Sequence, residues 1–316
     1  MSIDALALSL ERELSCKVTR DEPLARFTTY RLGGPAAIYV EPATEDDLVA
    51  MGKVLASADD RPPVLAVGRG SNLVISDEGW PGIAVRLGAA FSYVEGADGG
   101  ARAGGGTALP LLANWAARRG LEGAEFLIAI PGSVGGAVRM NAGAHGREIK
   151  DCLRSATIFD LASGSLDHRD VGELMFSYRH SNLSDTDLVL SGTFSLDPAD
   201  PAEVKAHMEA YRKHRADTQP GAVQNAGSVF RNPPGDHAGR LVEAAGLKGF
   251  SVGGARVSEL HANFFIAGDG STAQDVYDLV AEVRRRVQSA HGVDLIPEIR
   301  FVGTFVDHPG EVDIDE

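Results

Sequence analysis

A glycine-rich segment at residues 125–146 restricts the possible folds of this chain more than any other stretch. An apolar run ends there at Pro131 and is followed by glycines interleaved with Ser133, Arg139 and Asn141. Because glycine has no Cβ and readily adopts positive φ, successive N–H groups of such a segment can converge on an anion or on the edge of a flat ring. The pattern favours a cradle for a nucleotide or cofactor, with a set of tight turns in a β-rich domain as the alternative.

Another glycine-rich turn lies earlier in the chain, and we call it the first loop and the segment at 125–146 the second. This first loop, Gly68-Arg-Gly-Ser-Asn-Leu73, directly follows a short apolar strand predicted at 64–67. Leu73 stands where the dinucleotide fingerprint G-x-G-x-x-G requires its third glycine, and the residues that follow are typical of a strand instead of a helix. The P-loop pattern G-x-x-x-x-G-K-[ST] is absent as well. A nucleotide bound by these two loops would therefore be held in neither the Rossmann nor the P-loop manner.

Composition narrows the classes of partner. The chain has 316 residues, of which 37 are glycine, and a net charge of -14, so it offers no basic stripe for nucleic acid. Cys16 and Cys152 lie far apart in the sequence, which predicts no disulfide framework and no metal site and fits a reducing cytoplasm. No apolar run approaches the ~18 to 20 residues of a membrane span, and the N-terminus is not typical of a signal peptide.

The length predicts about two domains, with the main boundary near residue 200. Thr44 with Asp47 and Thr272 with Asp275 predict capping boxes, and Thr107 is expected to cap a helix that ends at Gly120. Hydrophobic periodicity predicts helices at 3–14, 44–55, 107–120, 237–245 and 272–287, a further helix from 200 onward, and strands at 37–41, 64–67, 73–75, 153–160, 188–196, 262–267 and 295–301.

In the last predicted strand, 295–301, Glu298 shares a face with Arg300, while Leu295 and Ile299 point to the other side. An ordinary half-exposed strand explains this alternation, and a carboxylate facing a ligand explains it equally well. Arg179 taken alone is typical of a surface arginine, and Ser228 taken alone is typical of a turn.

Several short motifs extend from about Phe27 to Phe301. They are Thr28-Thr-Tyr-Arg-Leu-Gly-Gly34, Gly68–Leu73, Ile130-Pro-Gly-Ser-Val-Gly-Gly-Ala-Val-Arg-Met-Asn-Ala-Gly143, Tyr178-Arg179, Ala226-Gly-Ser-Val-Phe-Arg-Asn-Pro233, Val257-Ser-Glu-Leu-His-Ala-Asn263 and Pro297-Glu-Ile-Arg300. In this order the set resembles the UDP-N-acetylenolpyruvoylglucosamine reductase family, the flavoenzymes of bacterial peptidoglycan precursor synthesis. No tyrosine lies between Arg179 and Pro201, so the chain resembles the shorter type, which lacks the tyrosine-bearing insertion.

The resemblance implies an α+β fold with a vanillyl-alcohol-oxidase-type (PCMH-type) FAD-binding domain. Its two subdomains would be 1–76 and 77–200, followed by a smaller α+β substrate-binding domain at 201–304 and an acidic tail at 305–316. FAD would be bound without a covalent bond. NADPH would reduce it and leave, and the enolpyruvyl sugar nucleotide would take the same site.

The implied product is UDP-N-acetylmuramate, formed by hydride transfer to C3 of the enolpyruvyl group and protonation of C2. The implied setting is the cytoplasm, with a part in cell wall biogenesis, cell shape and cell division, and the protein would be a monomer or a weak homo-oligomer.

The resemblance assigns catalytic roles to Arg179 and Glu298, at the substrate carboxylate, and to Ser228, as the acid that protonates C2. The charge that spreads into the carboxylate must be stabilised as it forms, and a serine can act as the acid only through its position. The residues implied at FAD are Gly68, Arg69, Gly70, Ser71, Asn72, Pro131, Gly132, Ser133, Gly135, Gly136, Asn141 and Gly143. Those implied at the substrate are Tyr178, Arg231, Asn232, Arg256, His261 and Arg300.

Two alternatives stay open. A sugar or lactone oxidase of the same fold would use oxygen as acceptor, but many such enzymes attach flavin to a histidine in the first glycine loop, and 68–72 contains none. A nucleotide-binding module without catalytic activity would keep the glycine loops without needing Ser228 and Glu298.

Overall fold

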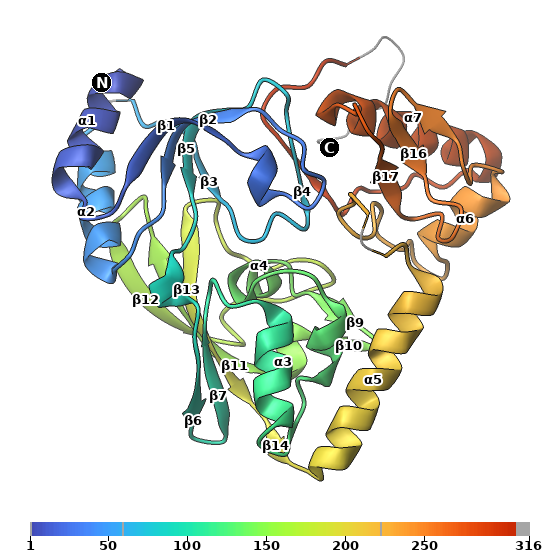
Figure 1. The fold of residues 1–316 in the computed structure, drawn as a ribbon, viewed down its shortest axis with the longest axis horizontal. Helices are drawn as coiled ribbons and strands as arrows, with labels where there is room; N and C mark the ends of the chain where they lie inside the picture. Colours follow the sequence, from blue (N-terminus) through green and yellow to red (C-terminus); the bar gives the residue numbers. More distant parts are fainter. Residues whose placement is uncertain (1, 59, 222, 308–316) are drawn as a thin grey trace. The chain divides into compact units, whose positions relative to one another are not determined.

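The computed structural model describes residues 2–58, 60–221 and 223–307, and these form two compact units that alternate along the chain (Figure 1). Unit 1 comprises Met1–Glu22, Ala37–Arg69 and Gly82–Arg215, and unit 2 comprises Pro23–Ala36, Gly70–Pro81 and Ala216–Glu316. The predicted boundaries after residues 76 and 200 stay predictions. Most of the predicted acidic tail, 308–316, lies outside the described residues.

A four-stranded sheet with the order β1-β2-β5-β3 opens the fold and lies mostly in unit 1. Its strands are β1 (Val18–Pro23), β2 (Pro35–Val40), β3 (Val64–Ala66) and β5 (Trp80–Val85). The helices α1 (Ile3–Glu13) and α2 (Glu45–Ala56) belong to the same apolar core, which gathers Leu10, Met51 and Ile83. Both halves of the capping box predicted at Thr44 and Asp47 are present at the start of α2.

Unit 1 also holds a five-stranded antiparallel sheet with the order β12-β11-β13-β7-β6. Its strands are β6 (Val94–Ala97), β7 (Gly100–Gly104), β11 (Leu153–Asp160), β12 (Ser165–Asp170) and β13 (Asp187–Ser195). Figure 1 shows β6 and β7 as a hairpin at one edge of this sheet. Residues 105–152 connect β7 to β11 and contain the second glycine-rich segment, 125–146. This segment is therefore attached at both ends to strands of the sheet.

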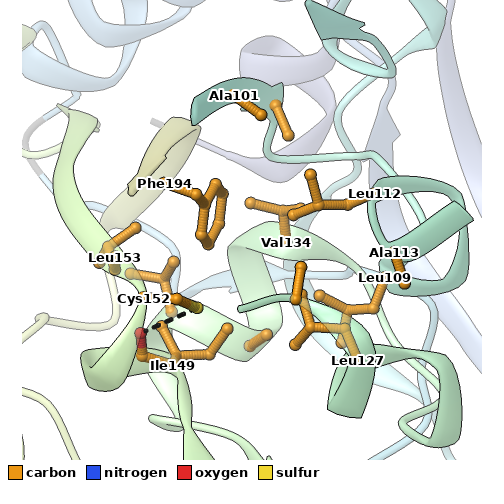
Figure 2. Packing of buried hydrophobic residues seen from close by; sticks show 14 of the residues in the cluster. Ala101, Leu109, Leu112, Ala113, Leu127, Val134, Ile149, Cys152, Leu153 and Phe194 are labelled. Atoms are coloured by element: carbon orange, nitrogen blue, oxygen red, sulfur yellow. Dashed lines mark hydrogen bonds between the residues drawn. The ribbon is translucent and has the colours of Figure 1, made fainter. Parts of the chain in front are cut away.

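The core beneath the second glycine-rich segment is apolar and closely packed. Figure 2 shows Phe194, Val134 and Leu112 gathered between the sheet and the helices α3 (Leu109–Ala117) and α4 (Val134–Arg139). Cys152 lies in the same core, where its thiol donates to Ile149 O (3.6 Å) and burial raises its pKa to about 12. Cys152 is therefore a packing residue.

Unit 2 contains a three-stranded antiparallel sheet and the long helix α7 (Ala273–His291). The strands, in order across the sheet, are β15 (Ser251–Val252), β16 (Ala255–Val257) and β17 (Phe265–Ala267). Apolar residues of α7 such as Val276, Val280 and Val287 recur on one face and are buried. The predicted capping box at Thr272 and Asp275 begins the helix. Unit 2 also contains the helix α6 (Ala238–Ala244) and a parallel pair of strands, β4 (Leu73–Ile75) with β18 (Arg300–Val302).

Early segments of the chain complete unit 2. Tyr30 and Val74 lie in its apolar core, and the Tyr30 hydroxyl donates to Phe265 O (3.1 Å). Asp77 accepts hydrogen bonds from Ala273 N (2.9 Å) and Gln274 N (3.1 Å), so its carboxylate lies at the positive end of the α7 dipole. These contacts explain why the two units alternate along the chain.

The shorter elements are η1 (Ala25–Phe27), η2 (Ala89–Phe91), β8 (Leu121–Glu122), η3 (Glu125–Ala129), β9 (Gly143–Ala144), β10 (Arg147–Glu148), η4 (Ile149–Asp151) and β14 (Asp197–Pro198). The helix α5 (Pro201–Thr218) begins where the sequence predicted a helix.

Two local predictions were wrong. Thr107 does not cap α3, because the helix begins at Leu109 and the Thr107 hydroxyl donates to Tyr93 O (2.8 Å) instead. The strand predicted at 295–301 is a strand only at β18. Pro297 has no N–H to donate, and the N–H groups of Glu298 and Ile299 both point to Val229 O (2.7 and 3.5 Å), which leaves no regular ladder.

Candidate active site

The two glycine-rich loops meet within unit 1. A Cβ placed on Gly68 would lie 2.7 Å from Ser133 Oγ, so the first loop approaches the second closely only because Gly68 has no side chain. Ser133 is buried, and its hydroxyl accepts from Gly136 N (3.4 Å) as the N-cap of α4. The two parts of the predicted cofactor cradle thus lie together.

From Gly70 onward the first loop belongs to unit 2, where it holds the segment that carries Glu298. Gly70 has φ +58°, and a Cβ there would overlap Phe27 O and lie 2.6 Å from Thr28 Cα. Asn72 Nδ2 donates to Glu298 O (2.9 Å), and Arg300 N donates to Asn72 O (2.9 Å). Asn72, which was predicted to bind FAD, therefore also positions the backbone of the segment 298–300, which contains the predicted catalytic residue Glu298.

Asn141 in the second loop is fully buried, and its side-chain amide uses both its donor and its acceptor atoms. Nδ2 donates to Glu148 Oε2 (3.0 Å) and to Ser177 O (3.0 Å), and Oδ1 accepts from Lys150 N (3.0 Å). Asn141 thereby ties the second loop to the residue that precedes Tyr178.

The glycines of the second loop have different neighbours. Gly135 N donates to Gly105 O (2.8 Å), and a Cβ on Gly135 would lie 3.1 Å from that same oxygen, so Gly135 allows α4 to pack on the sheet. Gly136 and Pro131 are exposed, and Gly132 is half-buried with φ +150°. The backbone of these three residues is the part of the second loop best placed to hold a ligand.

Arg179 lies in unit 1 in a left-handed conformation, φ +56°, which costs a residue other than glycine of order ~1–3 kcal/mol. Its side chain is 17% exposed, and Nη2 donates to Gly143 O (3.2 Å). The guanidinium carbon lies 4.9 Å from the centre of the Tyr178 ring, which is 43% exposed. Backbone strain of this kind is typical of functional sites.

Ser228 and Glu298 lie on adjacent segments of unit 2. Glu298 N donates to Val229 O (2.7 Å), and Ser228 pairs with Phe264 on the other side. The buried side chain of Asn263 holds the backbone next to Ser228 twice, accepting from Phe230 N (2.9 Å) and donating to Phe230 O (2.8 Å). The structure therefore brings together two of the three predicted catalytic residues, with Arg179 in unit 1.

The predicted substrate residues other than Tyr178 all belong to unit 2. Arg231 Nε is buried and, among the described residues, has no hydrogen-bond partner. A buried polar atom without a partner is costly, so this nitrogen suits an anionic ligand. Asn232 Oδ1 accepts from Ala238 N (3.0 Å) at the start of α6, while Arg256 and Arg300 are exposed.

His261, the remaining predicted substrate residue, is half-buried. Its Nδ1 accepts from Asn263 N (3.2 Å), and burial lowers the pKa of its imidazole. Burial therefore favours the neutral form of His261. Asn263 and Glu148 were not predicted as site residues, because their side chains contact other residues that carry or adjoin the site. The signal that could have indicated them is their position, Asn263 within the motif 257–263 and Glu148 shortly after the motif 130–143.

Two family models match the chain. The model described as UDP-N-acetylenolpyruvoylglucosamine reductase, C-terminal domain, matches residues 219–302, and the one described as FAD binding domain matches residues 36–168. UDP-N-acetylenolpyruvoylglucosamine reductase 2 of Symbiobacterium thermophilum is 43% identical over 91% of this chain and 92% of its own length. The chain belongs to the UDP-N-acetylenolpyruvoylglucosamine reductase family.

Other members of the reductase family agree. The reductase of Erythrobacter litoralis is 44% identical over 91% of this chain and 88% of its own length. The crystal structure of the reductase from Thermus caldophilus is similar with a TM-score of 0.78 and 34% identity, covering 92% of this chain and all of that one (100%). The predicted resemblance and α+β fold class are confirmed, and a reductase with an FAD-binding domain is supported over the oxidase alternative.

Two features are absent from residues 2–58, 60–221 and 223–307. None of their helices has the length and apolar character needed to cross a membrane. They also contain no group of three or more His, Cys, Asp or Glu side chains arranged to hold a metal ion.

Proposed function

We propose that this chain is an FAD-containing, NADPH-dependent enzyme that reduces UDP-N-acetyl-3-O-(1-carboxyvinyl)-glucosamine to UDP-N-acetylmuramate. Identity of 43% to a reductase of this name over nearly the whole chain supports the proposal. We also infer a cytoplasmic location, a part in peptidoglycan precursor synthesis and hence in cell shape and division, no nucleic-acid or membrane partner, and a monomer or weak homo-oligomer.

The glycine loops are the proposed FAD cradle. Gly68 leaves space where the two loops meet, and the exposed backbone at Pro131 and Gly136 offers groups without bulky side chains in front of them. When bound, FAD would take a hydride from NADPH and supply it to C3 of the enolpyruvyl group. The other cradle residues proposed are Arg69, Gly70, Ser71, Asn72, Gly132, Ser133, Gly135, Asn141 and Gly143.

Arg179, Glu298 and Ser228 are the proposed catalytic residues. Arg179 would stabilise the negative charge that develops at C2 and in the substrate carboxylate, and Glu298 would lie at the same carboxylate. Ser228 would then donate its hydroxyl proton to C2 and regain a proton from solvent water. Tyr178, Arg231, Asn232, Arg256, His261 and Arg300 would contact the rest of the UDP-sugar.

One structural observation supports the catalytic assignment most directly. Ser228 and Glu298 lie on neighbouring segments whose backbone is fixed by Asn263 and by Asn72. A serine is a weak acid in water, so it can protonate a carbanion efficiently only if its hydroxyl is held in place. The double hydrogen bond of Asn263 to Phe230 supplies that rigidity close to Ser228.

The two half-reactions test the role of Ser228. Ser228→Ala should leave flavin reduction by NADPH unchanged and slow substrate-driven reoxidation by about 10²- to 10⁴-fold, the range of lost general acid catalysis. Anaerobic rapid-mixing absorbance measures each rate, and Ser251→Ala, at an exposed serine of the same unit, is the control. Normal reoxidation in Ser228→Ala would remove Ser228 from the proton path.

The cofactor assignment has its own test. The purified protein should be yellow, with about one FAD per chain that is released intact on denaturation, because the first loop has no histidine to form a covalent flavin link. Protein that stays colourless after FAD is added would contradict the proposal. A flavin that remains attached after denaturation would favour the oxidase alternative.

A further inference from the structure

Glu148, which has no role in the function proposed so far, lies beside the guanidinium of Arg179. Glu148 Oε1 is 4.0 Å from Arg179 Nη1, and both side chains are largely buried, at 20% and 17% exposed. The other carboxylate oxygen, Oε2, accepts from Asn141 Nδ2 (3.0 Å) and from Lys150 Nζ (2.8 Å). The carboxylate is thus held by two groups on one side and faces Arg179 on the other.

The hairpin of β9 and β10 places this carboxylate. Glu148 pairs directly with Gly143 across the hairpin, and Gly143 O accepts from Arg179 Nη2 (3.2 Å). Arg179 therefore contacts both members of one register pair, a carbonyl on one strand and a carboxylate on the other. A Cβ on Gly143 would lie 3.3 Å from Arg179 Nη1 and 2.5 Å from Arg147 O, so the close approach depends on glycine.

Arg179 needs such support because its backbone is in a disfavoured conformation. A residue other than glycine at φ +56° persists only where its surroundings fix it. Asn141 contributes on the backbone side, since its Nδ2 also donates to Ser177 O, two residues before Arg179. Asn141 and Glu148 therefore both help to fix Arg179, together with the Gly143 carbonyl.

We propose that Glu148 is a positioning residue for Arg179: anchored by Asn141 and Lys150, its carboxylate fixes the guanidinium for the carboxylate of the substrate. This inference rests on the proposed function. It assigns to the second glycine loop a task beyond holding a cofactor, because the loop also orients the cation that the reduction requires. Displacing such a group by about 1 Å can cost ~10²-fold in rate.

The test compares Glu148→Gln with wild-type protein in the two half-reactions. Glu148→Gln keeps the side-chain shape and an acceptor for Asn141 but removes the charge. Flavin reduction by NADPH, FAD content and melting temperature should stay at wild-type values, while substrate-driven reoxidation slows by about 10- to 100-fold. Glu122→Gln, at an exposed glutamate of unit 1, is the matched control.

A double-mutant cycle with Arg179→Ala separates positioning from a general structural effect. If Glu148 acts through Arg179, adding Glu148→Gln to Arg179→Ala should slow reoxidation no further, within about twofold. Additive slowing, or reoxidation at the wild-type rate in Glu148→Gln, would overturn the inference. If Glu148→Gln loses FAD or has a lowered melting temperature, Glu148→Asp provides the test, because it keeps the negative charge. The inference then requires that Glu148→Asp is folded and that its flavin is reoxidised faster than that of Glu148→Gln. Wild-type protein that fails to turn over would instead count against the proposed function.

Discussion

The two glycine-rich loops look alike in sequence but are fixed in different ways. The first loop, 68–73, is held by residues distant in sequence, with Gly70 against Phe27 and Asn72 against Glu298. The second loop, 131–143, is held by its own sheet and hairpin, as Gly135 and Asn141 show. The comparison teaches that the second loop depends mainly on unit 1, whereas the first also requires unit 2.

Gly70→Ala should have the largest effect on stability. A left-handed alanine costs about 1–2 kcal/mol, and a Cβ overlapping the Phe27 backbone adds about 1–3 kcal/mol, so we expect a total loss of ~2–5 kcal/mol in the free energy of unfolding. Urea unfolding measures it.

Gly136→Ala is the control for this substitution in the second loop. Outside its own helix, the described residue that this Cβ would approach is Ser133, with Oγ at 3.6 Å, and alanine favours the helix by up to about 1 kcal/mol. Equal destabilisation by the two substitutions would break the distinction between the loops.

Asparagines provide the second comparison. Asn141→Ala removes a buried amide from three partners and should cost ~2–4 kcal/mol, while Asn72→Ala, at a half-buried residue, should cost ~1 kcal/mol. Melting temperatures of both variants with the flavin removed would measure the difference. A larger decrease in melting temperature for Asn72→Ala than for Asn141→Ala would mean that the contacts anchoring the first loop contribute more to stability than those anchoring the second.

The contact between the loops can be tested by a pair of substitutions. Gly68→Ala should cost about 1 kcal/mol because its Cβ approaches Ser133 Oγ, and Ser133→Ala should cost ~0.5–2 kcal/mol through loss of the α4 N-cap. The double variant should be more stable than the sum predicts, by at least ~0.5 kcal/mol, because the two side chains no longer collide. Strict additivity would show that the loops do not touch in solution.

The smallest expected effect is a pH dependence of the folding stability that arises from His261, which is linked by hydrogen bonds to the anchor of the first loop. Its anchor Glu298 bonds to Val229, whose own N–H donates to Asn263 O (2.8 Å), and Asn263 N donates to His261 Nδ1. Burial lowers the pKa of His261, so the unfolded chain binds this proton more readily than the folded one. The contribution to stability is present above about pH 6.5, the ordinary histidine pKa, and is lost as the pH falls through the lowered value.

His261→Asn keeps an acceptor for Asn263 but does not titrate, so its melting temperature should fall less than that of wild-type protein between about pH 7 and pH 5. His145, beside the second loop, also has a pKa lowered by burial and by the neighbouring His214, but it is exposed. His145→Asn should therefore change the pH dependence less. The reverse order would place the pH-sensitive anchor at the second loop.

Local signals predicted local structure well. The boxes at Thr44 and Thr272 depend only on residues three positions apart, and both are present. The glycine loops were evident because backbone-to-backbone approach demands glycine. The strand predicted at 295–301 was wrong because its hydrogen bonds go to Val229, a partner that alternation within one segment does not reveal.

The division into units was less accessible from sequence for the same reason. Tyr30 and Val74 enter the core of unit 2 through contacts that periodicity does not encode. The site residues were evident chiefly through resemblance, since Ser228 alone is typical of a turn. Glu148 and Asn263 position other residues, and neither their residue type nor their spacing in the sequence predicts that role.

The alternation of the units has a consequence for how the protein is made. During synthesis the segments Pro23–Ala36 and Gly70–Pro81 leave the ribosome long before Ala216–Glu316, with which they form one unit. Tyr30, Val74 and Asp77 must wait for partners such as Phe265 and the start of α7. A nascent chain stalled before residue 216 would therefore carry only the early segments of unit 2. A polypeptide beginning at residue 216 would lack Tyr30 of its core and the Asp77 carboxylate at the N-terminus of its longest helix.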